Sequence, residues 1–283
     1  MLVTTVVLSL NSETHIRACL ESVAAALAAL AEECEIYVVD NGSTDGSRAI
    51  IEDLQRAHPN LIYPTFNSRN LGTTVSRNLA LRKARGHYIL VLDSDVVVPD
   101  NTLSVLISAL EADPSCGLAA PKLIYPDGRP QISVDRFPSI GRKIARFFFL
   151  RRMEQEGAQP QEAPVAVDCA ISAFWLFRRE ILSQVGGLDE RFFYAPEDVD
   201  FCVSIWLSGY RVLYVPQAQA VHDARELSRR GAFNRFTLYH LSGLVRYFLK
   251  HRYIFSARRL YRRIAEAQRA RVVRASGDAT PGT

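Results

Sequence analysis

Short apolar runs alternate with longer amphipathic segments along the first 112 residues. The apolar runs are rich in β-branched and aromatic residues, which predicts buried strands at residues 3–10, 35–39, 60–64 and 88–92. Apolar residues at three- and four-residue spacing predict helices at about residues 13–30, capped by Ser12, 48–57 and, through Val75, Leu79 and Leu81, around 75–81. This alternation predicts an α/β fold with a doubly wound, mainly parallel sheet flanked by helices.

The second half of the chain is less regular. We expect a helix to about residue 112, a strand at 118–125, renewed order at 165–178, a helix at 196–208 and a strand at 210–215 that ends near 222. Residues 136–161 are basic, aromatic and irregular, so we interpret them as a mobile surface segment. We therefore divide the chain into a domain at 1–223, with halves at about 1–112 and 113–223, and a helical tail at 224–283 whose last residues we expect to be disordered.

Charge is distributed unevenly between the body and the tail. Residues 225–274 contain 14 Lys and Arg against 2 Asp and Glu, which leaves 20 basic and 28 acidic residues elsewhere. A basic tail on an acidic body indicates an anionic partner. Tyr, Phe and Leu alternate with Arg at helical spacing in this tail, which is consistent with a basic helix packed on the domain by its apolar face and with an interfacial helix on an anionic membrane surface. No nucleic-acid motif accompanies the charge, which argues against a nucleic-acid partner.

Cysteine usage and hydropathy indicate the cellular compartment of the protein. The five cysteines are scattered, without a CxxC pair, which argues against a disulfide framework and a zinc site and fits a reducing compartment. No apolar run approaches the length that spans a bilayer, and the N-terminus lacks a basic signal-peptide region. We therefore expect a cytoplasmic protein.

Acidic residues end the predicted central strand at residues 88–92. Asp93 and Asp95 follow it, and in extended backbone positions i and i+2 point to the same side, so the two carboxylates could share a cation. Asp40 ends the second strand and Ser9 and Asn11 end the first, which in a parallel sheet places them at the same edge. The alternatives are a solvated turn at Asp93–Asp95 and an Asx turn at Asp40.

Several motifs, in order, resemble those of one enzyme family. They are LSLN, VVDNGSTDGS, NLG followed by SRN, ARGHYILVLDSD, FFYAPEDVDFC and GYRVLYVPQAQAVH. Together they resemble the family 2 glycosyltransferases with the GT-A fold, closest to bacterial rhamnosyltransferase-like members. The resemblance covers roughly residues 3–222. It implies an inverting, metal-dependent transfer from a nucleotide-diphosphate sugar, with dTDP-rhamnose or a UDP-sugar favoured. The acceptor would be a saccharide, lipid-linked, in cell-surface polysaccharide synthesis at the cytoplasmic face of the inner membrane. Because acceptors in this family are often lipid-linked, the resemblance also favours peripheral contact of the basic tail with an anionic membrane.

The resemblance also implies roles for individual donor-side residues. Ser9, Asn11 and Asp40 would bind the nucleoside, with Asp40 reading the base. Arg77 and Asn78 would face the nucleotide or its diphosphate. The ligands of Mg²⁺ or Mn²⁺ would be Asp95, Asp93, which would also contact ribose or sugar, and His222.

On the acceptor side, the resemblance implies that an acidic pair supplies the catalytic base. Asp198 is our first choice and Glu197 the second, whereas the alternative is that both only favour the start of a helix. Acceptor-binding positions would be Ser172, Ala173 and Trp175, where the family's Gly-Ala is Ser-Ala followed by bulky Phe-Trp. Leu8–Asn11 also departs from the family's Pro-x-Tyr-Asn.

Two other functions are consistent with a sheet of this kind. A sugar-nucleotide nucleotidyltransferase would need a glycine-rich phosphate loop after the first strand, and LNSETHIRA contains no glycine. A catalytically silent sugar-binding relative is disfavoured by the intact Asp93, Asp95, Glu197 and Asp198.

Overall fold

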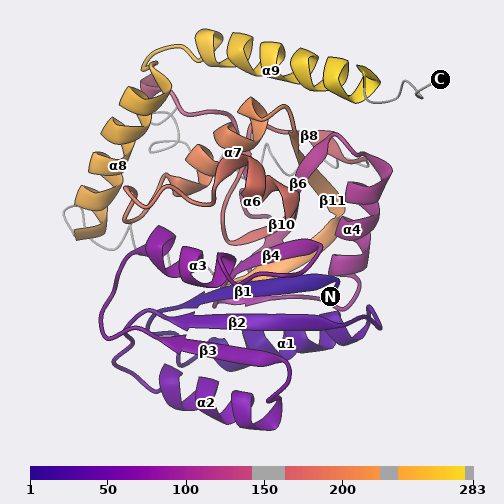
Figure 1. The fold of residues 1–283 in the computed structure, drawn as a ribbon. Coiled ribbons are helices and arrows are strands. Elements are labelled where there is room, and N and C mark those ends of the chain that lie inside the picture. The colour runs from indigo at the N-terminus through magenta and orange to yellow at the C-terminus, as the bar shows by residue number, and fades with distance from the viewer. Residues whose placement is uncertain (142–162, 224–234, 278–283) are drawn as a thin grey trace.

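The computed structural model describes residues 1–141, 163–223 and 235–277 and shows one mixed sheet with helices on both faces (Figure 1). The strands follow the spatial order β3-β2-β1-β4-β10-β6-β11-β5, and β8 pairs with β11. Their bounds are β1 (Val3–Ser9), β2 (Cys34–Asp40), β3 (Ile62–Phe66), β4 (Tyr88–Asp93), β5 (Val96–Val97), β6 (Cys116–Ile124), β8 (Val165–Ala166), β10 (Phe174–Arg178) and β11 (Arg211–His222).

The sheet is mainly parallel, as the alternation of strands and helices predicts. Strands β1 to β4 are mutually parallel, and β11 is parallel to β6. The exceptions are β5 and β8, which pair antiparallel with β11, and β10, which runs antiparallel between β4 and β6 and joins the two halves of the chain in one sheet. In this register Ser9 lies opposite Asp40, and Leu8 lies between Val39 and Asp93. The polar ends of these three strands therefore form one row at the carboxyl edge.

Both faces of the sheet are covered, which explains its continuous apolar strands. One buried cluster includes Val3, Val7 and Leu90 and takes in helices α1 (Ile16–Ala28), α2 (Ser47–Ala57) and α4 (Thr102–Ala112). The other includes Val6 and Val91 and takes in α3 (Thr73–Leu81), α6 (Glu180–Val185) and α7 (Glu197–Leu207). Successive strand residues thus point into opposite cores.

The basic tail forms two helices, α8 (Arg235–His251) and α9 (Arg258–Gly277). Leu260 and Ile264 of α9 are buried in the cluster that contains α7. Helix α8 lies along the side of the molecule and turns into α9 at its top (Figure 1). Within the described part of the chain, no helix combines the length and apolar character needed to cross a membrane.

Several local expectations are wrong in detail. Ser12 does not cap α1 through its side chain; its hydroxyl pairs with that of Ser94 at 2.6 Å instead, and the helix begins at Ile16. The third strand lies two residues later than expected, at Ile62–Phe66. Helix α3 buries Ser76, Arg77 and Asn78, so its inward face is partly polar. The apolar spacing of Val75, Leu79 and Leu81 predicted this helix correctly, but it did not indicate the polar part of the buried face.

Short structural elements were not predicted, and one predicted segment cannot be compared. Strands β5, β7 (Val134–Asp135), β8 and β9 (Cys169–Ala170) contain only two residues each, too few for a visible pattern. The predicted mobile segment at 136–161 lies outside the described residues from 142 onward. At its start, Phe137 is buried and its N–H donates to the Asp168 carboxylate at 2.9 Å, so this part is packed.

Candidate active site at the carboxyl edge of the sheet

Two acidic side chains and one imidazole meet where β4 and β11 end. Asp93 is the last residue of β4, Asp95 lies in the turn that follows, and His222 ends β11. Because β11 pairs with β5 so that His222 lies opposite Val96, the imidazole is brought next to the turn. One ligand atom from each of the three side chains lies within 4.8 Å of the other two. The aspartates converge through this turn and not, as expected, along extended backbone.

The chemistry of this cluster fits a divalent cation. Oδ1 of Asp95 is buried and makes no hydrogen bond to any described residue, which is unusual for a carboxylate oxygen. His222 Nε2 lies 3.4 Å from that oxygen, while Nδ1 lies 2.7 Å from Oε1 of Gln131. Carboxylate oxygens with one imidazole are suitable ligands for Mg²⁺ or Mn²⁺. Asp93, Asp95 and His222 could therefore hold such an ion.

The pKa values of Asp93 and His222 both lie above their ordinary values. Burial raises the pKa of Asp93 and the charge of Asp95 adds to the increase, while Arg77 opposes it. Burial lowers the pKa of His222, but the adjacent carboxylate of Asp95 outweighs it and leaves the pKa above its ordinary value. Desolvation and the nearby negative charge of Asp95 explain the raised pKa of Asp93, and the same negative charge explains the raised pKa of His222.

Arg77 links this cluster to the acidic pair of α7. Its side chain is only 1% exposed; Nη2 donates to Asp93 Oδ1 at 2.6 Å, and Nη1 lies 3.5 Å from Glu197 Oε1. The resemblance implied that Arg77 would face the nucleotide. The structure places it beneath the site, where it joins two carboxylates from opposite halves of the sheet. Such a buried arginine holds the two anions at fixed positions.

Glu197 and Asp198 open α7 in different environments. Glu197 is 5% exposed and accepts a hydrogen bond from Ser172 Oγ at 3.1 Å. Burial, and then the charge of Asp198, raise its pKa to about 7, although Arg77 acts against this. Asp198 is half-buried, and its Oδ1 accepts the N–H of Val199 at 2.8 Å. Of the two carboxyl groups, Asp198 is therefore the more accessible to a substrate.

The predicted nucleoside-binding residues lie together at the ends of β1 and β2. Ser9 is fully buried, and its hydroxyl has no hydrogen-bond partner among the described residues. Asp40 is buried and accepts hydrogen bonds from the Ser43 N–H at 3.2 Å and from the Ser43 hydroxyl. Asn11 accepts the Thr44 N–H at 2.8 Å. Asp40 therefore forms the local turn proposed as the alternative, which leaves its role in reading a base as a prediction.

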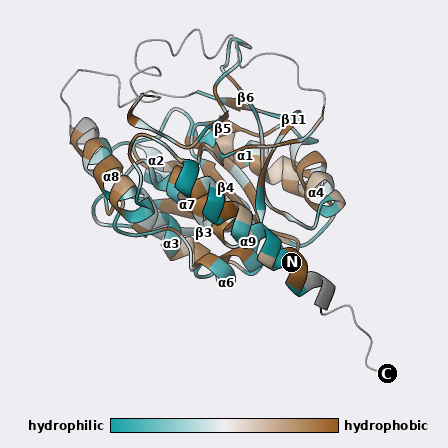
Figure 2. Ribbon diagram, turned by 90° about the horizontal axis from the view of Figure 1, so that it is seen from above, coloured by the Kyte–Doolittle hydropathy of each residue, from teal (hydrophilic) through white to brown (hydrophobic). Residues whose placement is uncertain are grey.

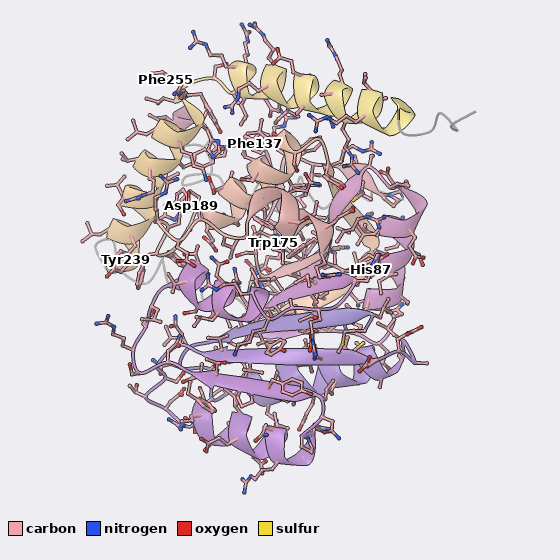
Figure 3. All side chains as sticks on the ribbon, viewed as in Figure 1. His87, Phe137, Trp175, Asp189, Tyr239 and Phe255 are labelled. Carbon is pink, nitrogen blue, oxygen red and sulfur yellow. The ribbon has the colours of Figure 1, made fainter. Side chains whose placement is uncertain are left out.

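Three of the expected contact residues are part of the packed interior. Asn78 exchanges hydrogen bonds with both backbone groups of Leu188, so it fixes the loop before α7. Trp175 is fully buried, stacks on Phe201 and donates from Nε1 to the Ala170 carbonyl at 3.1 Å; Figure 3 shows it inside the body of the molecule. Ala173 is buried as well. In this structure the accessible acceptor-side candidate is Ser172, which is half-buried.

Two residues near the site were missed by the sequence analysis. Gln131 orients His222, but it lies in a loop with no motif that could have indicated it. Asp200 lies in the acidic first turn of α7. It is 2% exposed and contacts Lys250 at 2.7 Å and His251 at 2.8 Å, so it attaches α8 to α7. The excess of basic residues in the tail was the available signal.

Comparisons with known proteins identify the family to which the sequence is similar. The family model described as glycosyl transferase family 2 matches residues 4–186. A relative from Mycobacterium tuberculosis, N-acetylglucosaminyl-diphospho-decaprenol L-rhamnosyltransferase, is 30% identical over 229 residues, which cover 74% of this chain and 73% of that protein. Rhamnosyltransferase WbbL of Escherichia coli is 26% identical over 174 residues, covering 60% of this chain and 65% of WbbL.

Solved structures show the same fold at lower identity. The mannosyltransferase PcManGT from Pyrobaculum calidifontis, in complex with GDP-Man and Mn²⁺, superposes with a TM-score of 0.62 at 21% identity, covering 99% of this chain and 76% of that one. GalNAc-T7 with UDP, GalNAc and Mn²⁺ superposes with a TM-score of 0.64 at 16% identity, covering 88% of this chain and 48% of that one. With its GT-A fold and its match across residues 4–186, this chain belongs to glycosyl transferase family 2 and is an enzyme of that family.

Proposed function

We propose that the protein transfers a hexose from a nucleotide-diphosphate sugar to a lipid-linked saccharide, with inversion at the anomeric carbon. L-Rhamnose carried on dTDP is the favoured donor, with a UDP-sugar second. The names of the M. tuberculosis and E. coli relatives support rhamnose, and the former also supports a lipid diphosphate acceptor. The observation that carries the proposal is the meeting of Asp93, Asp95 and His222 with the acidic pair of α7, joined through Arg77.

The donor and acceptor would bind to different halves of the sheet. Residues 1–112 supply the strand ends with Ser9, Asn11 and Asp40, which we assign to the nucleoside. Residues 113–223 supply Ser172 and the start of α7, which we assign to the acceptor. Since β10 joins the halves, the two substrates would meet above Arg77. Arg77 then holds Asp93 and Glu197 in place without touching either substrate.

The acidic cluster with His222 would hold the cation that stabilises the leaving group. We assign Asp93, Asp95 and His222 as ligands of Mg²⁺ or Mn²⁺, with Gln131 orienting the imidazole. When bound, the cation neutralises negative charge on the departing nucleoside diphosphate, which is electrostatic stabilisation. Two structural neighbours, PcManGT and GalNAc-T7, are complexes with Mn²⁺, which supports this assignment.

Asp198 is the proposed general base. A sugar hydroxyl is a weak nucleophile at neutral pH, and a carboxylate within hydrogen-bond reach can accept its proton as it attacks. Asp198 is the less buried member of the pair, whereas Glu197 is enclosed by Ser172 and Arg77. Attack from the side opposite the diphosphate exchanges one bond at the anomeric carbon for another and inverts its configuration.

A donor panel tests this function. The full chain is incubated with dTDP-rhamnose, UDP-sugars and GDP-mannose, with Mn²⁺ or with a chelator, and with a lipid-linked saccharide extract. We expect metal-dependent release of one nucleoside diphosphate and transfer of labelled sugar to the lipid fraction. Full transfer in excess chelator would contradict the metal assignment. Formation of pyrophosphate from a nucleoside triphosphate and a sugar phosphate would favour the nucleotidyltransferase alternative instead.

The proposed place of action is the cytoplasmic face of the inner membrane, in the synthesis of cell-surface polysaccharide. Lipid-linked acceptors are available there, and the charge of the tail suits an anionic surface. Cell fractionation with an antibody against the chain tests this placement, with the inner-membrane fraction as the expected location.

A further inference from the structure

Helix α8 is apolar on two opposite faces. One face packs on the domain: Tyr247 is fully buried, and a Cβ on Gly243 would lie 2.4 Å from the carbonyl oxygen of Ala195. The other face carries Leu238, Leu241, Val245 and Leu249, whose exposed fractions are 63%, 59%, 54% and 72%. At about 100° per residue these four side chains fall within an arc of roughly 80°, opposite the buried face. We name them the α8 stripe.

The stripe continues into the turn between α8 and α9. Phe255 is 81% exposed and Ile254 is 44% exposed, and Figure 3 shows Phe255 at the outer end of α8. Hydrophobic residues recur along α8 at the periphery of the molecule in Figure 2. Contiguous exposed apolar surface of this kind marks an interaction site in soluble proteins. None of the residues that the structure describes covers it.

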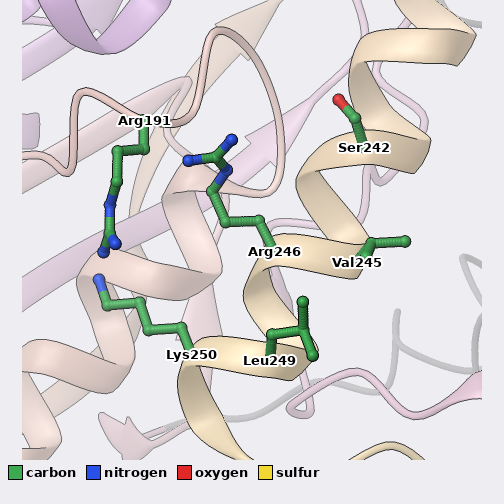
Figure 4. Close-up of a pocket in the computed structure, with 6 residues that line it drawn as sticks. All are labelled: Arg191, Ser242, Val245, Arg246, Leu249 and Lys250. Carbon is green, nitrogen blue, oxygen red and sulfur yellow. The ribbon is translucent and has the colours of Figure 1, made fainter.

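The charges around the stripe identify the kind of partner. The groove of about 390 Å³ beside it is lined by Arg191 on one side and by α8 on the other, with Ser242, Val245, Arg246, Leu249 and Lys250 (Figure 4). Arg191 and Lys250 are paired with Asp189, which leaves Arg246 as the cation next to the stripe. Helix α8 contains no acidic residue, and α9 contains Glu266 against seven arginines. A second copy of this chain on the stripe would place positive charge against positive charge. Lipid phosphates with acyl chains beneath them match both the cations and the leucines.

Helix α8 contacts both α7 and the segment that precedes it, which form the proposed acceptor site. Lys250 and His251 contact the buried Asp200 of α7, and the ring of Tyr239 lies 4.4 Å from that of Phe193. Phe193 and Ala195 belong to the segment that leads directly into Glu197. A surface bound to the stripe would therefore sit at a fixed distance from the proposed acceptor site.

We propose that the α8 stripe and Phe255 insert into an anionic bilayer, while Arg246 and the arginines of α9 contact its headgroups. This inference rests on the proposed function, because it names the surface on which a lipid-linked acceptor is met. It also divides the tail: α8 enters the interface, whereas α9 buries Leu260 and Ile264 on the domain and supplies charge.

Vesicle sedimentation tests the insertion. The full chain is mixed with vesicles of phosphatidylcholine alone or with 30 mol% phosphatidylglycerol, roughly at physiological salt. We expect binding to the anionic vesicles only, and at least a tenfold loss of binding in a Leu241→Asn/Leu249→Asn variant, since asparagine removes the apolar surface that each leucine would bury in the bilayer. Both leucines are exposed, so the variant should fold. An Arg48→Gln/Arg56→Gln variant on α2, with its side chains 60% and 75% exposed, is the control for charge alone and should bind as wild type does.

Fluorescence gives a second readout that sedimentation cannot mimic. Both native tryptophans are buried, Trp175 fully and Trp206 at 9% exposed, so a Phe255→Trp variant adds the one tryptophan at the proposed interface. Its emission should shift to shorter wavelength on addition of anionic vesicles and be quenched by lipids brominated in the acyl chain. Emission that is unchanged by vesicles would overturn insertion.

Two further outcomes would assign the stripe to another occupant. A concentration-dependent dimer that the Leu241→Asn/Leu249→Asn variant abolishes, without any vesicle binding by the wild type, would make it a self-association surface. Equal binding to neutral and anionic vesicles would overturn the electrostatic part. Thermal stabilisation by donor nucleotide and Mn²⁺ should be the same in the variant and the wild type, so failure of docking can be distinguished from failure of the proposed transferase activity.

Discussion

Replacing the buried Glu197 with glutamine should stabilise the protein at alkaline pH. Burial and the neighbouring Asp198 charge raise the pKa of Glu197 from 4.5 to about 7. Between these two values the folded protein holds a proton that the unfolded chain has lost. The free energy of unfolding therefore falls as pH rises through this window. At about 1.4 kcal/mol per pH unit, the loss amounts to about 3 kcal/mol.

Glutamine removes this titration but keeps the side chain's shape. Its amide oxygen can still accept from Ser172, and it carries no charge to desolvate. We therefore expect Glu197→Gln to match wild type near pH 4.5 and to exceed it by about 3 kcal/mol near pH 8. The advantage is reduced by whatever attraction between Glu197 and Arg77 is lost. Urea unfolding of both proteins at half-unit pH steps, in the presence of a chelator, measures the difference directly.

Glu190→Gln is the control, because the pKa of Glu190 is lowered whereas that of Glu197 is raised. Hydrogen bonds from Asn78 and then Arg82 lower the pKa of Glu190, so its stabilisation is lost only as pH falls below the ordinary range for glutamate. Its difference from wild type should be constant between pH 5 and 8. If Glu197→Gln also shows a constant difference across this window, Glu197 is not desolvated as the structure indicates, and the argument from burial is wrong.

Four substitutions test the remaining parts of the site. Asp95→Asn should raise the dissociation constant for donor in Mn²⁺ by at least about tenfold, because it removes a metal ligand, as measured by titration calorimetry. Asp40→Ala should raise the same constant by about 10- to 100-fold through loss of a charged hydrogen bond to the base. Asp198→Asn should lower turnover by about 10²- to 10⁴-fold in a transfer assay while donor binding is retained. Gly243→Ala should destabilise the fold by about 1–3 kcal/mol in urea, since its Cβ would lie 2.4 Å from the Ala195 carbonyl oxygen.

Each of these variants has an outcome that would contradict its assignment. Donor affinity that is unchanged in folded Asp40→Ala would leave Asp40 as a turn residue only. Wild-type turnover in Asp198→Asn together with an inactive Glu197→Gln would exchange the roles within the pair. Gly243→Ala with wild-type stability would mean that α8 is not held against the segment before α7. A donor dissociation constant of Asp95→Asn that equals the wild-type value in the presence of Mn²⁺ would contradict the cation site.

The order of strands and helices could be predicted from the sequence because both faces of this sheet are buried. Burial on both sides requires continuous apolar strands, and their polar ends mark the edge where Asp40, Asp93 and Asp95 lie. The acidic start of α7 and the basic tail were equally visible, since charge and helix starts are local properties. These features depend on neighbours within a few positions along the chain.

Only the tertiary structure decided which of these residues face a substrate and which support others. Arg77 and Trp175 looked like contact residues, yet the first is buried between Asp93 and Glu197 and the second stacks on Phe201. Likewise, α8 exposes its leucines because Asp200 binds the opposite face through Lys250 and His251. Each of these outcomes depends on partners many residues away, and a one-dimensional pattern contains no record of such distances.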